Sequence, residues 1–287
     1  MKQHVRVSVI IPAWNEAKHI ADCLKSVATQ TLQPDEVIVV DNMSTDTTAA
    51  VAASFSFVTL LHQTAEQGLI ATRNMGFAHA SGDILVRLDA DIVLDPDWVK
   101  RAVADFQNDA RLGGVTGLDV GHVLEYAPWR STLWSRMYFL GSTATFRMPV
   151  LWGANMAIRR QAWEQVRPHA AQRDVDVHED LDLSLLLASY GWKTRQDGGL
   201  RIQKDGREYH KWPKLWAYKK RRTLTKQRHL KMGSFNRPGA LFYPQWHTWL
   251  WWTFVLAIPG SIFFGTSYVA YSLKRFARLF GIHISYD

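Results

Sequence analysis

The chain has 287 residues, of which 47% are hydrophobic and 21% are charged, and this composition excludes a disordered chain. The length suits one large domain, or one domain with an appendage. Cys23 is the only cysteine, which excludes an internal disulfide and a cysteine-based metal site. The formal net charge of +8 is compatible with nucleic acid, anionic lipid or a substrate phosphate as a partner.

The first half of the chain alternates between strand and helix patterns. Short apolar runs rich in β-branched residues predict strands at 5–11, 36–40, 57–61, 84–88 and 156–159. The first helix has Ile20, Leu24 and Val27 on one face and Asn15 as its expected N-cap. Further helices are predicted after a cap at 44–46, at 68–80, from 95–97 onward and at 180–190, which Gly191 ends. This alternation predicts an α/β fold with a mostly parallel central sheet.

Two clusters of carboxylates are the most informative feature. Asp89 and Asp91 follow the apolar run 84–88, and Glu179 and Asp180 open the helical pattern near residue 180. A divalent metal binds hard oxygen ligands of this kind and leaves positions for phosphate oxygens. A separate carboxylate can take a proton from a hydroxyl. Together they predict the transfer of a sugar from a nucleotide diphosphate.

The strand ends also place a further carboxylate near this site. Asp41 ends the second predicted strand, as Asp89 ends the fourth. Ligands of open α/β sheets bind at the carboxyl ends of the strands, so we expect both groups on one rim.

The C-terminal part is basic and then apolar. Nine Lys or Arg residues and no acid lie between 211 and 231, and 246–273 has no Asp, Glu, Lys or Arg. The apolar stretch is long enough for a spanning helix, although Pro259-Gly260 interrupts it. A kinked span, a re-entrant hairpin, an interfacial helix pair and a buried tail all stay open. The N-terminus has no apolar signal region, so we expect no cleaved leader.

The order of short motifs resembles family 2 glycosyltransferases with the GT-A fold, an inverting class that uses nucleotide-diphospho sugars. The resemblance covers about residues 5–230. Its motifs lie at 10–16, 39–46, 68–76, 80–83, 88–91, 153–157 and 179–184. One departure is Lys219-Lys220-Arg221-Arg222, which stands where processive members carry Gln-x-x-Arg-Trp and therefore favours a single transfer. Arg221 or Arg222 could instead bind the diphosphate or anionic lipid.

The resemblance implies a role for each matching residue. Asp180 would be the catalytic base. Mg2+ or Mn2+ would be held by Asp91 and His210. The nucleotide sugar would bind at Pro12, Ala13, Glu16, Asp41, Arg73, Asp89 and Ala90. The acceptor would bind at Trp152, Gly153, Asn155 and Glu179.

The expected protein is an inverting glycosyltransferase that moves one sugar from a UDP- or GDP-sugar to a hydroxyl of a lipid-linked or cell-envelope glycan. Its expected parts are a catalytic domain at 1–210, a basic juxtamembrane segment at 211–245 and a hydrophobic membrane segment with a basic tail at 246–287. The positive-inside rule places the catalytic domain on the cytoplasmic side of the membrane. The alternatives are a polyprenyl-phosphate glycosyltransferase, a non-catalytic scaffold, and a basic binder of nucleic acid or lipid. The apolar neighbour favours lipid over nucleic acid.

Overall fold

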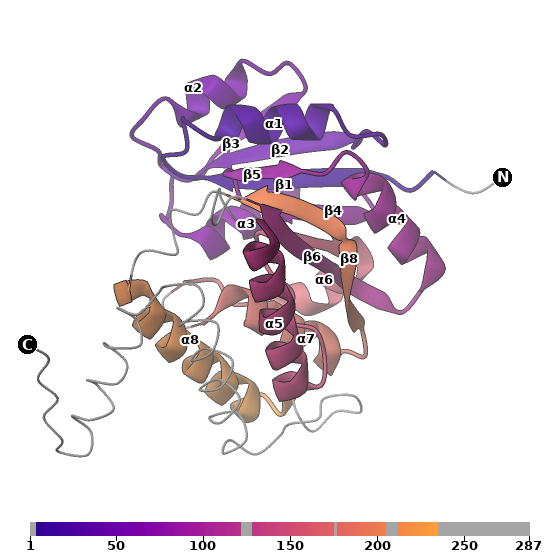
Figure 1. Ribbon diagram of the computed structural model, residues 1–287. Helices are drawn as coiled ribbons and strands as arrows, with labels where there is room; N and C mark the ends of the chain where they lie inside the picture. Colours follow the sequence, from indigo (N-terminus) through magenta and orange to yellow (C-terminus); the bar gives the residue numbers. More distant parts are fainter. Residues whose placement is uncertain (1–3, 122–127, 175–176, 205–211, 235–287) are drawn as a thin grey trace, which may run out of the picture.

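The computed structural model describes residues 4–121, 128–174, 177–204 and 212–234 (Figure 1). Its strands are β1 Val7–Ala13, β2 Glu36–Asp41, β3 Val58–His62, β4 Ile84–Leu88, β5 Ile92–Leu94, β6 Leu112–Gly121, β7 Asn155–Arg159 and β8 Lys193–Lys204. Its α-helices are α1 Ile20–Ala28, α2 Thr48–Ala53, α3 Leu69–His79, α4 Trp98–Asn108, α5 Pro128–Phe146, α6 Arg160–Val166, α7 Glu179–Ser189 and α8 Trp212–Lys231. The α/β class is therefore confirmed.

The sheet is mixed but mostly parallel, as predicted, because six of its eight strands run in one direction and only β5 and β7 oppose them. Its strand order is β3-β2-β1-β4-β7-β6-β8-β5. The first four strands in this order are parallel, as are β6 and β8. Strand β7 runs antiparallel to both β4 and β6, and β5 runs antiparallel to β8. Strand direction depends on distant partners, so the local apolar pattern at 155–159 could not reveal it.

Helices cover both faces of the sheet, because side chains alternate along each strand. Val9 and Ile11 of β1 belong to a core cluster with residues of α1 and α4. Ile10, between them, packs in the opposite cluster with residues of α3, α6 and α7. In Figure 1, α1 and α2 lie at the top of the molecule, while α5, α7 and α8 lie at the bottom.

Local predictions agree with the elements to within a few residues, with one exception at the first helix. Helix α1 begins at Ile20 after His19, and Asn15 lies outside it in the left-handed region with φ 54°. The Asn15 side chain caps a different segment, because its Oδ1 accepts a hydrogen bond from Thr45 N at 2.8 Å. Gly191 ends α7 with φ 84°, as predicted.

Helix α8, in the basic segment, is attached to α7. His229 Nε2 lies 2.9 Å from Asp182 Oδ1, and His178 N donates to Thr225 Oγ1 at 2.7 Å. Within the described ranges, no helix combines the length and the apolar character that a membrane crossing requires. The predicted membrane segment at 246–287 and residues 235–245 lie outside the described residues.

Candidate active site

The carboxyl ends of three adjacent parallel strands form the rim on which the site is built. Ala13 ends β1 and pairs in register with Asp41, which ends β2. Asp89 follows the end of β4, which is hydrogen-bonded to β1 on its other side. Strand pairing therefore brings the two predicted carboxylate positions to one edge, as expected for a ligand site of an α/β sheet.

Asp41 has one oxygen with partners and one without. Its Oδ2 accepts a hydrogen bond from Ser44 N at 3.4 Å and lies 3.6 Å from His62 Nδ1. Its Oδ1 is buried and accepts no hydrogen bond from the residues that the structure describes. A buried acceptor normally has a partner, so this oxygen suits an N–H of a bound ligand.

The loop after β1 lies beside Asp41. Pro12 and Ala13 are buried, and Asn42 N donates to the Ala13 carbonyl at 2.8 Å. Glu16 is partly exposed, and its backbone N–H donates to Thr48 Oγ1 at 2.8 Å, which ties the loop to α2. Pro12 and Ala13 thus lie beside the end of β2, while Glu16 is held through its backbone against α2.

Asp89 and Asp91 converge on one positive charge. Lys204 Nζ lies 2.7 Å from Asp89 Oδ2 and 3.8 Å from Asp91 Oδ1. Burial alone would raise the pKa of Asp89, but the cations of Lys204 and Arg87 outweigh it and lower this pKa to about 2. Ala90 is buried between the two acids and contributes no polar side chain.

Arg87 connects the two carboxylate clusters. Its Nη2 donates to Asp89 Oδ1 at 2.7 Å. Its Nη1 lies 3.7 Å from Glu179 Oε1 and 4.0 Å from Asp180 Oδ1. The guanidinium is 2% exposed, so these attractions act with little solvent screening. Arg87 therefore joins residues that are separated by about ninety positions of sequence.

Asp180 lies at the N-terminal turn of α7, where a helix favours negative charge. Burial raises the pKa of the Asp180 carboxyl above its usual value, while Arg87 and a hydrogen bond from Gly153 N–H oppose this increase. Gly153 must lack a side chain, because a Cβ there would overlap both Arg87 Nη1 and Asp180 Oδ1. A carboxylate with a raised pKa suits general-base chemistry.

Two predicted site residues, Arg73 and Asn155, are buried and contact other parts of the protein. Arg73 is 2% exposed, and its Nη1 lies 3.2 Å from Glu179 Oε1, so it holds Glu179 in place. Asn155 is fully buried, accepts from Trp98 Nε1 at 2.8 Å and donates to the Leu200 carbonyl at 3.1 Å. Asn155 is therefore part of the core, and its predicted contact with the sugar acceptor stays a prediction.

The remaining predicted residues divide between the site and its surroundings. Trp152 is partly exposed, and its ring centroid lies 6.0 Å from Lys204 Nζ. Arg222 packs over the ring of Phe146 at 5.9 Å, while Arg221 is exposed on α8. His210 lies outside the described residues.

Arg87 and Lys204 are not among the site residues that the sequence predicted. A charged residue inside the apolar run 84–88 is a signal for Arg87, since a buried guanidinium needs carboxylate partners. Lys204 has no such local signal, because its partner Asp89 lies 115 positions away.

The residues present fit a divalent metal. The oxygens of Asp89 and Asp91 are hard donors, and both carboxylates lie within 4 Å of the Lys204 ammonium. No group of three or more metal-binding side chains occurs among residues that the structure describes. A metal at this pair would therefore need further oxygen ligands from outside the protein, such as phosphate oxygens or water.

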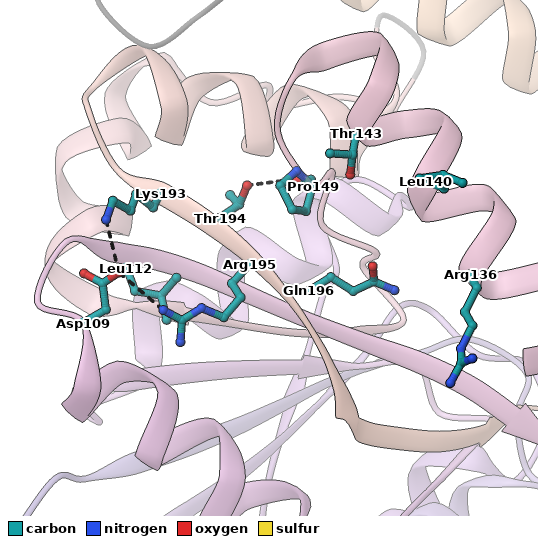
Figure 2. Close-up of a pocket in the computed structure, with 10 residues that line it drawn as sticks. All are labelled: Asp109, Leu112, Arg136, Leu140, Thr143, Pro149, Lys193, Thr194, Arg195 and Gln196. Atoms are coloured by element: carbon teal, nitrogen blue, oxygen red, sulfur yellow. Dashed lines mark hydrogen bonds and ion pairs between the residues drawn. The ribbon is translucent and has the colours of Figure 1, made fainter. Parts of the chain in front are cut away.

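A separate cavity of about 660 Å³ lies away from these carboxylates (Figure 2). Leu140 and Arg136 of α5 line one side, and Lys193 and Arg195 of β8 line the other. Both of these β8 cations lie 3.4 Å from Asp109 Oδ2. None of the predicted site residues lines this cavity, so it is distinct from the rim site.

Comparison with known families identifies the class of the protein. Residues 8–167, which are 160 of the 287 residues, match the family described as Glycosyl transferase family 2. The chain belongs to this family.

Named relatives agree with this class. The chain is 39% identical over 127 residues to Glycosyltransferase AglE of Haloferax volcanii, which covers 42% of this chain and 40% of that protein. It is 28% identical over 210 residues to Probable glycosyltransferase YdaM of Bacillus subtilis, which covers 68% of this chain and 49% of that protein. The chain thus spans less than half the length of these relatives.

Solved structures share the fold at low identity. Mannosyltransferase PcManGT from Pyrobaculum calidifontis, in complex with GDP-Man and Mn2+, has a TM-score of 0.61 at 20% identity. That comparison covers 95% of this chain and 84% of the other. Glucosyl-3-phosphoglycerate synthase from Mycobacterium tuberculosis, with Mn2+, UDP and phosphoglyceric acid, has a TM-score of 0.56 at 19% identity, covering 82% and 80%. These similarities confirm the predicted GT-A fold.

Proposed function

We propose that the protein is an inverting glycosyltransferase that moves one sugar from a UDP- or GDP-sugar to a hydroxyl. The observation that carries the proposal is that Arg87 contacts both Asp89, at the carboxyl end of β4, and Asp180, at the start of α7. This connection supports a diphosphate site and a proton acceptor that act side by side. Family membership and the donor complexes of structures with the same fold support the donor class.

The donor binds across the ends of β1, β2 and β4. The buried Oδ1 of Asp41, which has no hydrogen-bond partner among the described residues, accepts the ring N–H of the nucleotide base. Uracil and guanine each offer such an N–H, so Asp41 holds the base without choosing between them. The backbone of Pro12 and Ala13 forms the wall beside it.

Asp180 performs the proton transfer. Its carboxylate takes the proton of the acceptor hydroxyl while that oxygen forms a bond to the anomeric carbon. The bond from this carbon to the diphosphate breaks at the same time, and its electron pair leaves with the nucleoside diphosphate. One displacement inverts the configuration of the anomeric carbon, as in single-displacement glycoside chemistry.

Asp91 and Asp89 would hold Mg2+ or Mn2+ together with oxygens of the diphosphate. A bound divalent cation supplies positive charge that stabilises the leaving diphosphate. Lys204 and Arg87 keep Asp89 ionised. Glu179 contacts both Arg73 and Arg87, and so helps to hold the Arg87 guanidinium near the Asp180 carboxylate.

The acceptor is proposed to be a lipid-linked or cell-envelope glycan, reached at a membrane surface from the cytoplasmic side. The support is compositional: the basic stretch 211–231 and the apolar stretch 246–273 follow the catalytic part directly. The full chain should co-sediment with vesicles of anionic lipid at low and high salt. Recovery in the supernatant under both conditions would remove the membrane part of the proposal.

The function is tested with the full chain in detergent. We expect one class of nucleotide sugar, tested as GDP-mannose and UDP-N-acetylglucosamine among others, to bind in isothermal titration calorimetry with Mn2+ and to hydrolyse slowly. Asp180→Asn should keep donor binding and lose turnover by at least about 100-fold. Asp22→Asn, at a side chain of α1 that is 66% exposed, is the matched control and should behave as wild type. If no UDP- or GDP-sugar binds with Mn2+ present, the proposed function fails.

A further inference from the structure

A second cavity, of about 480 Å³, lies beside the start of α4. Three arginines line it, and each comes from a different element: Arg101 from α4, Arg136 from α5 and Arg201 from β8. All three residues are exposed. Arg136 also borders the larger cavity that Figure 2 shows. The fold therefore gathers three guanidinium groups from distant parts of the chain at one place.

These guanidinium groups have no carboxylate partner among the residues that the structure describes. Arg201 donates only through Nε, to the Gly198 carbonyl at 3.2 Å. The side chain of Arg101 lies against Gly199, where an added Cβ would overlap its Nη1. A guanidinium carries five N–H donors. Unlike the buried Arg87, these exposed arginines thus keep donors that a ligand can use.

Two carboxylates, Asp95 and Asp97, line the same cavity. Three cations and two carboxylates give the lining a net positive charge, which favours an anion. A guanidinium fork matches the oxygens of a phosphate, whereas an ionised carboxylate accepts hydrogen bonds from hydroxyl groups. The combination therefore suits a ligand that carries both a phosphate and hydroxyl groups, as a phosphorylated sugar does.

The cavity is close to the proposed reaction site along the chain. Strand β5 separates Asp91 from Asp95, and four residues of chain can span at most about 14 Å between these two Cα atoms. Asp95 N donates to the Arg201 carbonyl at 3.2 Å, which fixes the cavity to the end of β5. A short run of linked sugars can bridge this distance. One acceptor molecule can therefore reach both places.

We propose that Arg101, Arg136 and Arg201 form a second binding site, which takes a phosphorylated sugar unit of the acceptor away from its reacting hydroxyl. The arginines bind the phosphate, and Asp95 and Asp97 accept hydrogen bonds from the sugar hydroxyls. The inference rests on the proposed function for the identity of the ligand as an acceptor. Binding of the phosphorylated sugar itself requires neither the donor nor a metal.

The test measures binding to the full chain in detergent, in EDTA and without nucleotide sugar. Isothermal titration calorimetry follows three probes: inorganic phosphate, glucose 6-phosphate and dioctanoyl phosphatidic acid. We expect glucose 6-phosphate to bind most tightly. Arg136→Met should lose about tenfold of that affinity, the usual worth of a charge-assisted contact. Arg136→Lys should lose less, because it keeps the charge without the fork. The triple variant with methionine at 101, 136 and 201 should lose the binding altogether.

Arg167→Met is the matched control and should bind as wild type does, because its side chain is 52% exposed and lies outside the cavity. Equal affinities of wild type and the triple variant for glucose 6-phosphate would overturn the inference. So would a wild type that does not bind this probe, a result that does not depend on whether a variant folds. Binding of phosphatidic acid without glucose 6-phosphate would replace the sugar by a lipid phosphate and overturn the assignment.

None of these failures touches the proposed function, which donor binding with Mn2+ tests separately. If glucose 6-phosphate binds through the arginines but no UDP- or GDP-sugar binds, the proposed function fails. The ligand could then no longer be assigned as an acceptor, and the inference would fail in that part as well.

Discussion

Substitution of Arg87 by methionine tests whether the link between the two carboxylate clusters controls the base. The Nη1 atom lies 4.0 Å from Asp180 Oδ1 and 3.7 Å from Glu179 Oε1. At an effective dielectric constant of about 20, a unit charge at 4 Å is worth up to about 4 kcal/mol. Loss of such a partner typically raises the pKa of a carboxyl by about 1 to 3 units.

The proposed role of Asp180 as the base decides in which direction Arg87→Met changes the activity. Burial already raises the pKa of this carboxyl, and Arg87 is the largest influence that opposes the increase. The base is active when ionised, so a higher pKa makes activity decline at a higher pH. The acid limb of the pH–rate profile of Arg87→Met should therefore move upward by about 1 to 3 pH units.

The assay is donor hydrolysis from pH 5 to 9 at saturating nucleotide sugar, with thermal unfolding measured on each variant. Arg87→Lys retains a cation and should shift the limb less. Arg73 also contacts Glu179 but acts more weakly on Asp180, so Arg73→Met should shift the acid limb less as well. A folded Arg87→Met protein whose acid limb coincides with that of wild type would refute the reasoning.

Three further predictions concern positions around the same helix. Gly153→Ala should lower donor hydrolysis by about 100-fold, because the added Cβ would overlap Arg87 and Asp180. Gly141→Ala on α5, where an added Cβ would meet no described side chain within 4 Å, should leave the rate unchanged; equal rates for the two variants would contradict the close approach at Gly153. His178 has its pKa lowered from 6.5 to about 3 by burial and by Arg222, so the unfolded chain binds the extra proton below pH 6.5 and stability should fall by about 1.4 kcal/mol per pH unit as the pH drops from 6.5 toward 3. Urea titrations at pH 5 and 7 should show this dependence reduced in His178→Asn, and an unchanged dependence would show that other groups cause it. Asp182→Ala breaks a buried pair with His229 at 2.9 Å and should cost about 3 to 5 kcal/mol of unfolding free energy in urea, far more than removal of an exposed pair; a loss below about 1 kcal/mol would contradict that role.

Much of the rim was predictable because its signals are local. The run 84–88 coincides with β4, and Asp41 ends β2 as predicted. The hydrophobic periodicity and the residues that begin and end each element are local properties of the sequence, so they identify these elements without tertiary contacts. The glycine at 191 was likewise recognisable, since its positive φ belongs to the helix end itself.

Other parts depend on contacts that no local pattern encodes. Strand β7 enters the sheet between β4 and β6 with the opposite direction, which its five residues alone do not specify. Strand β8 mixes polar and apolar residues and bends through register shifts against β6, so it lacks a clean alternation. Asn155 belongs to a motif of the family, yet its amide is used inside the core by Trp98 and Leu200. Only the fold distinguishes such a support from a ligand contact.

The attachment of α8 to α7 has a consequence for how the protein is made. The family match ends at residue 167, before α7 begins, while Asp182 of α7 receives its partners His229 and Arg228 from α8. A nascent chain on the ribosome that has emerged only as far as α7 still has a carboxylate without these two partners. The helix that bears Asp180 is therefore completed only after α8 has been synthesised. In a growing chain, β1, β2 and β4 emerge before α7, whereas α7 acquires its contacts with α8 only after that helix has emerged.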